Sequence, residues 1–475
     1  MKNHTPFRRL SEKECEKLHS ASLEILQRTG VRMHHQPAID LLKKAGASVS
    51  DGNRVRIPSK LVEDALKTVP HEITLYNRHG EPAVPIGNFR TFYGTGSDCL
   101  NILDHRTGER RKPVLQDVIE GVTLCDALPN IDFVMCMFLP VDVPRMVADR
   151  YQSEAMFRFT TKPIVFVTTD LAGCIDAVEM AEAVVGGADT LQQKPLTACY
   201  INVTSPLQHN EEALQKLLYL SAKGLPATYI PVALGGATAP ITVAGNLAIW
   251  NAGSLVGLVI SQLNRPGAPF ITSGWGASAL DMRTTVSPYV EPEKQFIAQE
   301  MAHFYDLPMF AFGGFSDSKL PDQQANIEAA LTLMTNSLSG SHLVHDLGYL
   351  ESGLTGSLAQ LVICDELISW IKTSLMPVEI NDETLALDVI DEVGPDGHFI
   401  SNAHTLAHFR QRWYPTLFDR SNYDGWIAKG GKDLGQRAAE KAEQLLAKHT
   451  PEPLPGEIQK RLQEIVKQAK SQETT

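Results

Sequence analysis

The sequence lacks the features that mark secreted, disulfide-rich or membrane proteins. Its 475 residues carry only seven cysteines, which are scattered along the chain with no C-x-x-C pair. The odd number and the spacing argue against a disulfide framework and favour buried thiols in a reducing, cytoplasmic compartment. The N-terminus has no apolar segment of the signal-peptide type. No run reaches the ~18 apolar residues of a membrane span, and residues 247–263, which come closest, are predicted to form a buried helix.

Positive charge is scarce as well. The 43 lysines and arginines are outnumbered by 55 aspartates and glutamates, which gives a formal net charge of −12. Nucleic-acid binding requires a clustered positive surface, so nucleic acid is not an expected partner. The G-x-G-x-x-G dinucleotide fingerprint and the G-x-S-x-G nucleophile motif are missing, and no His/Asp/Glu set has a convincing metal spacing. The sequence therefore predicts no metal site.

What the sequence does contain is a regular alternation of short apolar runs and helical stretches. The runs have strand length and are rich in β-branched and aromatic residues. X-Pro steps such as Leu307–Pro308 end several of the helical stretches just before the next run. The eight predicted strands are residues 89–93, 131–138, 163–168, 196–203, 227–234, 269–273, 308–312 and 342–345.

This alternation predicts an α/β fold. Near-continuous apolar strands separated by helices indicate parallel strands that are covered on both faces. Eight such units fit a (β/α)8 TIM barrel within residues 86–376, and a doubly wound open sheet is the alternative. Residues 1–85 are expected to form an N-terminal helical extension. Residues 377–475 are expected to form a charged C-terminal helical tail, which favours a homo-oligomer.

Candidate site residues follow from the barrel prediction, because active sites of such barrels lie at the C-terminal ends of the strands. Aromatic residues are numerous there, although they make up only 7% of the chain. Each one alone is more often a core residue, but together they would form a cage for a quaternary ammonium group. The candidates for this cage are Tyr93, Phe138, Trp275, Phe312, Phe315 and Tyr349.

Polar residues at the same strand ends complete the candidate site. His345 and Asn202 are candidates for hydrogen bonds to a substrate, and His345 is also a candidate catalytic residue, although a lone strand histidine is more often a core residue. Asp317, the second candidate catalytic residue, would position the loop after the seventh strand together with Lys319, unless the two form an ordinary loop ion pair. Glycines at the strand exits either make tight turns or allow a large ligand to come close.

The segment 313–328, G-G-F-S-D-S-K-L-P-D-Q-Q-A-N-I-E, resembles the trimethylamine methyltransferase family. Further likeness lies in residues 18–31, in Y-G-T-G-S-D (93–98) and in S-G-W-G-A-S (273–278), so the resemblance covers nearly the whole chain. It implies a corrinoid-dependent methyltransferase with a (β/α)8 barrel. Family members that use trimethylamine carry pyrrolysine shortly after this motif, whereas the matching region here, 325–328, holds ordinary residues. The chain therefore resembles the non-pyrrolysine branch, whose known activities include demethylation of glycine betaine and related quaternary amines.

The ordinary residues in that region have a chemical logic. A neutral tertiary amine that loses a methyl group would leave as an amide-like anion, so it must first be activated. A quaternary ammonium leaves as a neutral amine, and the enzyme has to orient the methyl group and exclude water. In this reading His345 and Asn202 would hydrogen-bond the carboxylate of glycine betaine, and the product would be dimethylglycine.

The resemblance also implies a protein partner. The cobalamin-binding signature D-x-H-x-x-G is absent, so a separate corrinoid protein is expected to bring the Co(I) methyl acceptor to the mouth of the barrel. The residues expected to contact the corrinoid are Gly94, Gly96, Gly235, Gly236, Gly313, Gly314, Ser316 and Lys319.

Several alternatives stay open at this point. The substrate could be another quaternary amine, namely proline betaine, carnitine or choline. A barrel lyase that uses Lys319 as a Schiff base is a rival enzyme. A quaternary-amine sensor or storage protein is the non-enzymatic alternative, and it would bind the amine without transferring a methyl group.

Overall fold

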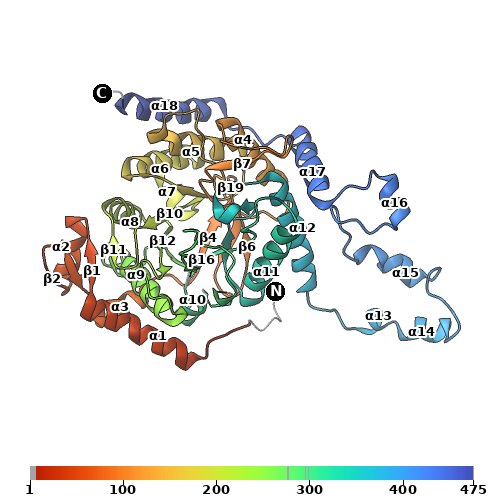
Figure 1. Cartoon of the computed structure of the whole chain (residues 1–475), viewed down its shortest axis with the longest axis horizontal. Helices are drawn as coiled ribbons and strands as arrows, with labels where there is room; N and C mark the ends of the chain where they lie inside the picture. Colours follow the sequence, from red (N-terminus) through yellow and green to blue (C-terminus); the bar gives the residue numbers. More distant parts are fainter. Residues whose placement is uncertain (1–6, 275–277, 295, 298, 474–475) are drawn as a thin grey trace.

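The computed structural model describes residues 7–274, 278–294, 296–297 and 299–473. At its centre lies a seven-stranded parallel sheet with the strand order β6-β17-β16-β14-β12-β10-β9, and helices surround it (Figure 1). These strands confirm the predicted α/β class. They are β6 (Phe92–Tyr93), β9 (Ile164–Val167), β10 (Thr197–Val203), β12 (Ala227–Pro231), β14 (Phe270–Ser273), β16 (Met309–Phe312) and β17 (Leu343–His345).

The second predicted strand, residues 131–138, is different from the other seven. It forms no continuous strand, but Phe133 pairs with Gly94 and Val134 pairs with Ile164 as single parallel bridges. The backbone N–H of Asp132 donates to the carbonyl of Tyr93 at 2.6 Å. This segment therefore lies between β6 and β9, the two edge strands of the sheet. Its pairing is short on one side because β6 itself has only two residues.

The inner face of the sheet and the segment 131–138 share one apolar core. Each of six strands contributes inward-pointing side chains to it, Phe133 and Met135 come from the segment, and Phe92 of β6 packs against them. Neighbouring residues on each strand face the helices instead, which is the two-residue alternation of a strand. The strand residues of the inner core are Val165, Ala198, Tyr200, Ile230, Ile271, Phe310 and Leu343.

A hairpin covers the N-terminal ends of the strands. It consists of β4 (Ile73–Tyr76) and β5 (Pro82–Ile86), and its apolar side chains join the inner core. The N–H of Tyr76 donates to the carbonyl of Pro195, two residues before β10 begins. Because this end is closed, a site can open only at the C-terminal ends.

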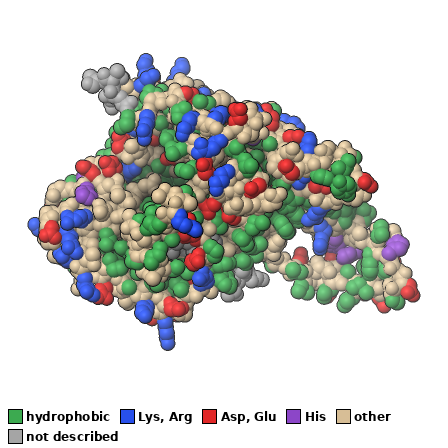
Figure 2. Space-filling model, viewed as in Figure 1, with side chains coloured by type: hydrophobic (Ala, Val, Ile, Leu, Met, Phe, Trp, Pro, Cys, Tyr) green, Lys and Arg blue, Asp and Glu red, His purple; other side chains and the backbone are tan. Residues whose placement is uncertain are grey.

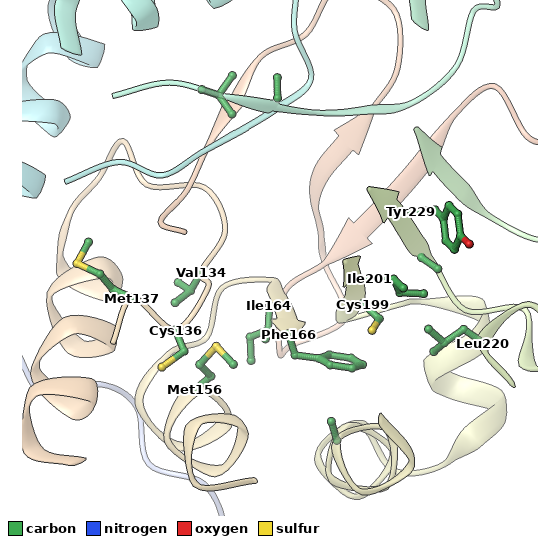
Figure 3. Packing of buried hydrophobic residues seen from close by; sticks show 14 of the residues in the cluster. Val134, Cys136, Met137, Met156, Ile164, Phe166, Cys199, Ile201, Leu220 and Tyr229 are labelled. Atoms are coloured by element: carbon green, nitrogen blue, oxygen red, sulfur yellow. The ribbon is translucent and has the colours of Figure 1, made fainter. Parts of the chain in front are cut away.

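Helices cover the outer face of the sheet, and neighbours in the chain pack side by side. Figure 3 shows part of this layer, where Ile164, Phe166 and Ile201 from the strands lie with Met156 and Leu220 from the helices. The helices are α4 (Leu115–Ala127), α5 (Ala148–Phe159), α6 (Leu171–Val185), α7 (Ala188–Gln193), α8 (Glu211–Lys223), α9 (Val243–Asn264), α10 (Glu300–Phe304), α11 (Gln323–Ser339) and α12 (Leu358–Ser374).

Within the described residues, α9 is the one helix long and apolar enough to cross a membrane, and 78% of its most apolar stretch is buried. The N-terminal residues bury it, because α1 (Glu12–Glu24), α2 (Gln36–Lys44) and α3 (Ser59–Leu66) all pack against it. A capping box of Ser11 and Glu14 starts α1. A π-helical turn (Ile25–Thr29) ends it. The prediction of a buried core helix is thus supported.

Short strands extend the structure around this core. The sheet β11-β1-β3-β2 joins the N-terminal region to the loop after β10, so this region is not purely helical. The other small sheets lie in the loops that follow the strands of the central sheet. The short strands are β1 (Val31–Met33), β2 (Ser48–Ser50), β3 (Arg54–Arg56), β7 (Asn101–Leu103), β8 (Arg110–Arg111), β11 (Gln208–His209), β13 (Leu234–Gly235), β15 (Ser278–Ala279), β18 (Tyr349–Leu350) and β19 (Thr355–Gly356).

After α12 the chain leaves the body and later returns to it. Residues 376–432, here called the arm, carry the short helices α13 (Asp382–Leu385), α14 (Leu387–Val393), α15 (Ala403–His408) and α16 (Tyr423–Ala428), which extend away from the body in Figure 1. None of these four helices has a buried residue. The charged helices α17 (Leu434–Lys448) and α18 (Gly456–Glu473) pack back onto α12, α5 and α6.

Candidate functional site

A group of buried side chains centred on His345 lies at the C-terminal ends of the strands. His345 ends β17, and its ring centroid lies 4.3 Å from those of Phe310 and Phe312 and 5.6 Å from that of Tyr200. Its Nδ1 lies 2.7 Å from the carbonyl oxygen of Ala311. Since a carbonyl can only accept, Nδ1 carries the proton and donates, which leaves Nε2 as an acceptor. The structure therefore places a histidine of defined tautomer among three aromatic rings.

The His345 side chain is neutral. Burial lowers the pKa of His345 to about 3, against the opposing effect of its hydrogen bond to Ala311. Its Nε2 lies 3.4 Å from the carboxyl oxygen Oδ1 of Asp346. A neutral imidazole can bind and orient a neighbouring group, but it offers no positive charge to a substrate carboxylate.

Asp346 is the most unusual group of the site. It is 4% exposed, and burial raises the pKa of its carboxyl group to about 8. Among the residues that the structure describes, no lysine or arginine lies within ion-pair distance of it. Its backbone has φ +76°, a left-handed conformation that is uncommon outside glycine. The chain thus holds an acidic group, protonated near neutral pH, at the end of β17.

Gly96 provides the space for Asp346. A Cβ atom on Gly96 would lie 1.9 Å from Oδ1 of Asp346 and 2.6 Å from the hydroxyl oxygen of Tyr349. That hydroxyl is buried and has no hydrogen-bond partner within the described part of the chain. An unpaired buried hydroxyl beside a buried carboxyl group is a place where a polar ligand atom would be stabilised.

Asp317 fixes the loops above this group. Its Oδ1 accepts hydrogen bonds from the N–H of Tyr289 at 2.8 Å and from the hydroxyl of Ser352 at 2.7 Å. Its Oδ2 accepts from the N–H of Val290 at 3.1 Å. The ring of Tyr289 in turn meets Phe315 edge-on, with centroids 5.3 Å apart. Asp317 is therefore a positioning residue that ties three loops together, as the sequence predicts for the loop after the seventh strand.

A second polar pocket, of about 290 Å³, lies beside β9 and β10. Asp98 lines it, and burial raises the pKa of Asp98 to about 6, while Gln152 donates to its Oδ1 at 2.9 Å. Asn202 also lines this pocket and lies two residues after Tyr200, so the two side chains share a face of β10. Arg145 and Lys216 contribute positive charge to the same walls.

The structure brings together several of the predicted site residues. His345, Phe312 and Tyr349 meet around Asp346 and Gly96, and Phe315 joins them through Tyr289. Asn202 lies in the adjoining pocket. Trp275 lies outside the described residues.

Two predicted cage residues are not part of this group. Tyr93 faces the helices, where its hydroxyl lies 2.6 Å from that of Ser337 and the Lys372 ammonium lies 5.4 Å from its ring centroid. The reason is the alternation along β6, which turns Phe92 inward. Phe138 is buried against Gly121 of α4 and against Gly356, again away from His345. We leave Tyr93 and Phe138 out of the proposed cage.

The space beside most of the glycines predicted to contact a corrinoid is filled by packed side chains. A Cβ on Gly94 would lie 2.4 Å from the ring of Phe133, and one on Gly313 would lie 2.8 Å from Val344. Gly314 has φ +75° and lies against Leu347, and Gly235 is buried. Ser316 is also buried and donates to Glu328 at 2.6 Å. Of the six glycines predicted to contact the corrinoid, Gly236 and Gly314 have the positive φ of the tight-turn alternative, and the other four are buried.

The remaining two candidates, Gly236 and Lys319, are exposed at the mouth. Gly236 lies beside Ile241 and Met282, whose side chains are 63% and 65% exposed. Lys319 donates to the backbone carbonyl of Asp317 at 2.8 Å. An exposed lysine outside any apolar pocket lacks the surroundings that activate a Schiff-base nucleophile, which disfavours the lyase alternative.

Sequence reasoning missed four groups of this site. Asp346 directly follows His345, and Tyr200 precedes Asn202 by two residues, so both could have been found from the strand pattern. Asp98 ends the Y-G-T-G-S-D segment after the first predicted strand, whereas Tyr289 lies in a long loop that no local pattern marks. Tyr289 is placed by Asp317, a contact between residues 28 positions apart.

These features define an α/β protein with a buried carboxyl group and aromatic rings at the C-terminal ends of its parallel strands. The family model described as trimethylamine methyltransferase (MTTB) matches residues 1–474. The chain belongs to this family of methyltransferases, which confirms the resemblance seen in the sequence.

Relatives with two different names match almost the whole chain. The trimethylamine methyltransferase MttB of Desulfitobacterium hafniense is 35% identical over 466 residues, which cover 97% of this chain and 94% of the relative. The glycine betaine methyltransferase of another strain of that species is 32% identical over 467 residues, covering 97% and 96%. Among solved structures, the monomethylamine methyltransferase MtmB of Methanosarcina barkeri matches with 13% identity and a TM-score of 0.48, covering 93% of this chain and 88% of that one.

The space at Gly96 gives a direct test of the site. In a Gly96→Ala variant the added methyl group must displace Asp346 and Tyr349, and a displacement of about 1 Å at a reacting centre costs on the order of a hundredfold in rate. We expect the rate of methyl transfer to fall by about that factor. Circular dichroism should show that the variant is still folded. The control is Gly456→Ala, because no atom lies within 4 Å of a Cβ at Gly456. Full activity of Gly96→Ala would contradict the assigned site.

Proposed function

We propose that this protein transfers a methyl group from a quaternary amine to the Co(I) of a corrinoid carried by a partner protein. Glycine betaine is the proposed substrate, and dimethylglycine is then the product. Membership in the methyltransferase family supports the reaction type. The observation that carries the choice of a quaternary amine is the buried carboxyl group of Asp346 beside His345, whose ring lies among three aromatic rings.

The electrostatics of this group suit a permanent cation. Asp346 is protonated near neutral pH, because burial without a counter-charge disfavours the carboxylate. A quaternary ammonium would supply that charge, and the rings of Phe310, Phe312 and Tyr200 would offer it their negative faces. A lysine or arginine at this place would repel the cation, and among the described residues none pairs with Asp346. This group of side chains is thus complementary to a cation that cannot lose its charge.

The transfer itself needs little from the protein. The methyl carbon forms a bond to Co(I), which acts as the nucleophile, while the C–N bond breaks and its electron pair stays on nitrogen. The amine leaves neutral, so no proton has to be supplied. Asp346 and the rings hold the cation, and His345 packs against Phe310 and Phe312 as a neutral ring of fixed tautomer beside Asp346. Closed packing around Gly96 excludes water from the reacting methyl group.

Hydrogen-bond donors are also present for the carboxylate group of glycine betaine. The unpaired hydroxyl of Tyr349 and the amide of Asn202 are available, and Arg145 lines the pocket beside Asn202. His345 cannot contribute a positive charge, because its pKa is lowered to about 3. We therefore assign recognition of the carboxylate to Asn202 and Tyr349, with His345 as a neutral orienting group.

We also infer that the central sheet closes into a (β/α)8 barrel. The bridges from Phe133 to Gly94 and from Val134 to Ile164 support this, as does the shared inner core of all eight segments. The proposed domains keep the bounds 1–85, 86–376 and 377–475. The cytoplasm is the proposed location, supported by seven cysteines that are all buried and unpaired.

The exposed apolar residues at the mouth are the proposed contact for the corrinoid protein. Ile241, Met282 and Val286 come from the loops after β12 and β14, and they are 63%, 65% and 41% exposed. Gly236 lies among them and leaves room for a flat ring. A macrocycle that docks at this patch would face the C-terminal ends of the strands, where the methyl group is held.

The substrate panel is the main test. Under anaerobic conditions, chemically reduced cobalamin is mixed with the protein and with glycine betaine, proline betaine, carnitine, choline or trimethylamine, and the corrin absorbance is followed. We expect methyl transfer from a quaternary amine and none from trimethylamine, with Asp346→Asn strongly impaired. Transfer from trimethylamine alone would refute the proposal. If free cobalamin accepts no methyl group, calorimetric binding decides, and absence of quaternary-amine binding is then the refuting result.

The raised pKa of Asp346 predicts proton release on substrate binding. Below pH 8 the empty site holds a proton that a bound cation expels, so the affinity should rise with pH, by up to about tenfold per pH unit, and level off above about pH 8. Calorimetry at neutral pH in two buffers of different ionisation enthalpy should give close to one proton released per quaternary amine. Asp346→Asn serves as the control and should release none. Equal proton release by both proteins would assign the proton to another group.

The arm supports the proposed homo-oligomer. Helices of four to seven residues do not persist in water without a packing partner. The arm nevertheless exposes large apolar side chains, among them Val378 at 83% and Ile400 at 85%. A groove of about 610 Å³ at its base, lined by Trp370, Trp413 and Tyr414, offers a matching aromatic surface. We assign a second copy of this chain as the partner, because each copy presents both the arm and the groove.

Charged side chains introduced on the arm should weaken the contact between two copies of the chain. We expect light scattering to give the mass of at least a dimer for the natural chain, and a lower mass for the double variant Val378→Asp with Ile400→Asp. Leu331→Asp is the matched control, since Leu331 is 57% exposed on α11 of the body. A monomeric natural chain would contradict the assignment.

A further inference from the structure

The arm carries a second cluster of chemically active side chains, far from the His345 site along the chain. Glu383 of α13 and His404 and His408 of α15 each offer a ligand atom, and these atoms all lie within 4.8 Å of one another. The two histidines are four residues apart on one helix, so they lie on the same face of it. Figure 2 shows histidine side chains gathered on the arm.

The hydrogen bonds of this cluster turn its ligand atoms toward one another. The Nδ1 of His408 lies 2.9 Å from Oε1 of Gln411, and since that oxygen only accepts, Nδ1 carries the proton. The Nε2 of His408 lies 3.1 Å from the carboxylate oxygen Oε1 of Glu383, and a bound metal ion would replace the proton that these two atoms share. A histidine that donates its other N–H to an oxygen is the arrangement by which metal-binding histidines are oriented.

His404 completes the cluster. Its ring centroid lies 4.3 Å from that of His408, and its Nε2 donates to the backbone carbonyl oxygen of Glu383 at 3.1 Å, so a metal ion would bind Nδ1 or replace this hydrogen bond. Two imidazole nitrogens and one carboxylate thus approach a common point from two helices. None of the three residues is buried, so an ion could reach this point from solvent.

We propose that Glu383, His404 and His408 bind one divalent first-row transition metal ion, with Zn²⁺ as the best match. Imidazole nitrogen and carboxylate oxygen are regular Zn²⁺ ligands, and three protein ligands leave further positions to water. The spacing H-x-x-x-H on a helix, with a carboxylate from another segment, supplies the required geometry. Magnesium and calcium prefer all-oxygen sites, so they are not expected here.

The ion has a structural consequence for the arm. Neither α13 nor α15 has a buried residue, so little apolar packing holds them together. A metal ion bound by Glu383 and by the two histidines would join the segments on both sides of residues 386–402. The ion would therefore stiffen the arm, and this role does not depend on methyl transfer.

The test measures metal content directly. Untagged full-length protein is stripped with a chelator, dialysed, and titrated with Zn²⁺ against a chromophoric competitor. We expect one ion per chain, with affinity reduced about tenfold or more in Glu383→Gln and still further in the double variant His404→Ala with His408→Ala. His398→Ala is the matched control, because His398 is an exposed arm histidine outside the cluster and its loss should change nothing.

A second measurement covers the case that a variant alters the arm itself. Limited proteolysis of the natural chain should cut within residues 386–402 more slowly with Zn²⁺ than without it. Co²⁺ in place of Zn²⁺ should add visible ligand-field absorption that the double variant lacks. A natural chain that retains no Zn²⁺, or a double variant that binds it as tightly as the natural chain, would overturn the proposal.

Discussion

The burial of a carboxyl group without a cation is the constraint on which the site depends. Transfer of a carboxylate from water into a protein interior is costly unless a positive charge accompanies it. Asp346 meets this constraint by keeping its proton, as the rise of its pKa to about 8 indicates. Asp346 has a left-handed backbone conformation, and Gly96, which has no Cβ, leaves room for its carboxyl group. The site is thus neutral while empty near neutral pH.

The surrounding structure serves that one group in separate ways. Alternation along β16 and β17 turns Phe310, Phe312 and His345 to the same face, so the rings line the approach to Asp346. Asp317 holds the loop of Tyr289 by two hydrogen bonds and accepts a third from Ser352 at the mouth. The hairpin β4–β5 closes the opposite end of the sheet. A substrate can therefore enter from the C-terminal ends alone, which is also where the methyl acceptor has to approach.

The sequence was a good guide to elements with a strong local pattern. Seven of the eight predicted strands are present, since an apolar run flanked by helices has few other ways to bury itself. The pattern was weaker where position depends on a partner. Phe92 and Tyr93 are both aromatic, and only the pairing of β6 with β17 decides that Phe92 faces inward. In the sequence, Gly94 and Gly313 suggest loops with open space beside them. In the structure, a side chain from a distant segment occupies the space beside each glycine.

The same reasoning explains why the sequence describes the arm only as part of a helical tail that favours a homo-oligomer, without its contacts. Its helices are short and expose apolar residues on all sides, so no periodic face predicts a partner. The histidines His404 and His408 have helical spacing, but the third ligand, Glu383, comes from 21 residues earlier and becomes a neighbour only through the path of the chain. A segment that cannot bury a core of its own needs other cross-links to keep a shape. The proposed contact with a second copy and the proposed coordination of one ion would supply such cross-links at different places on the arm, and both would act without touching the site at Asp346.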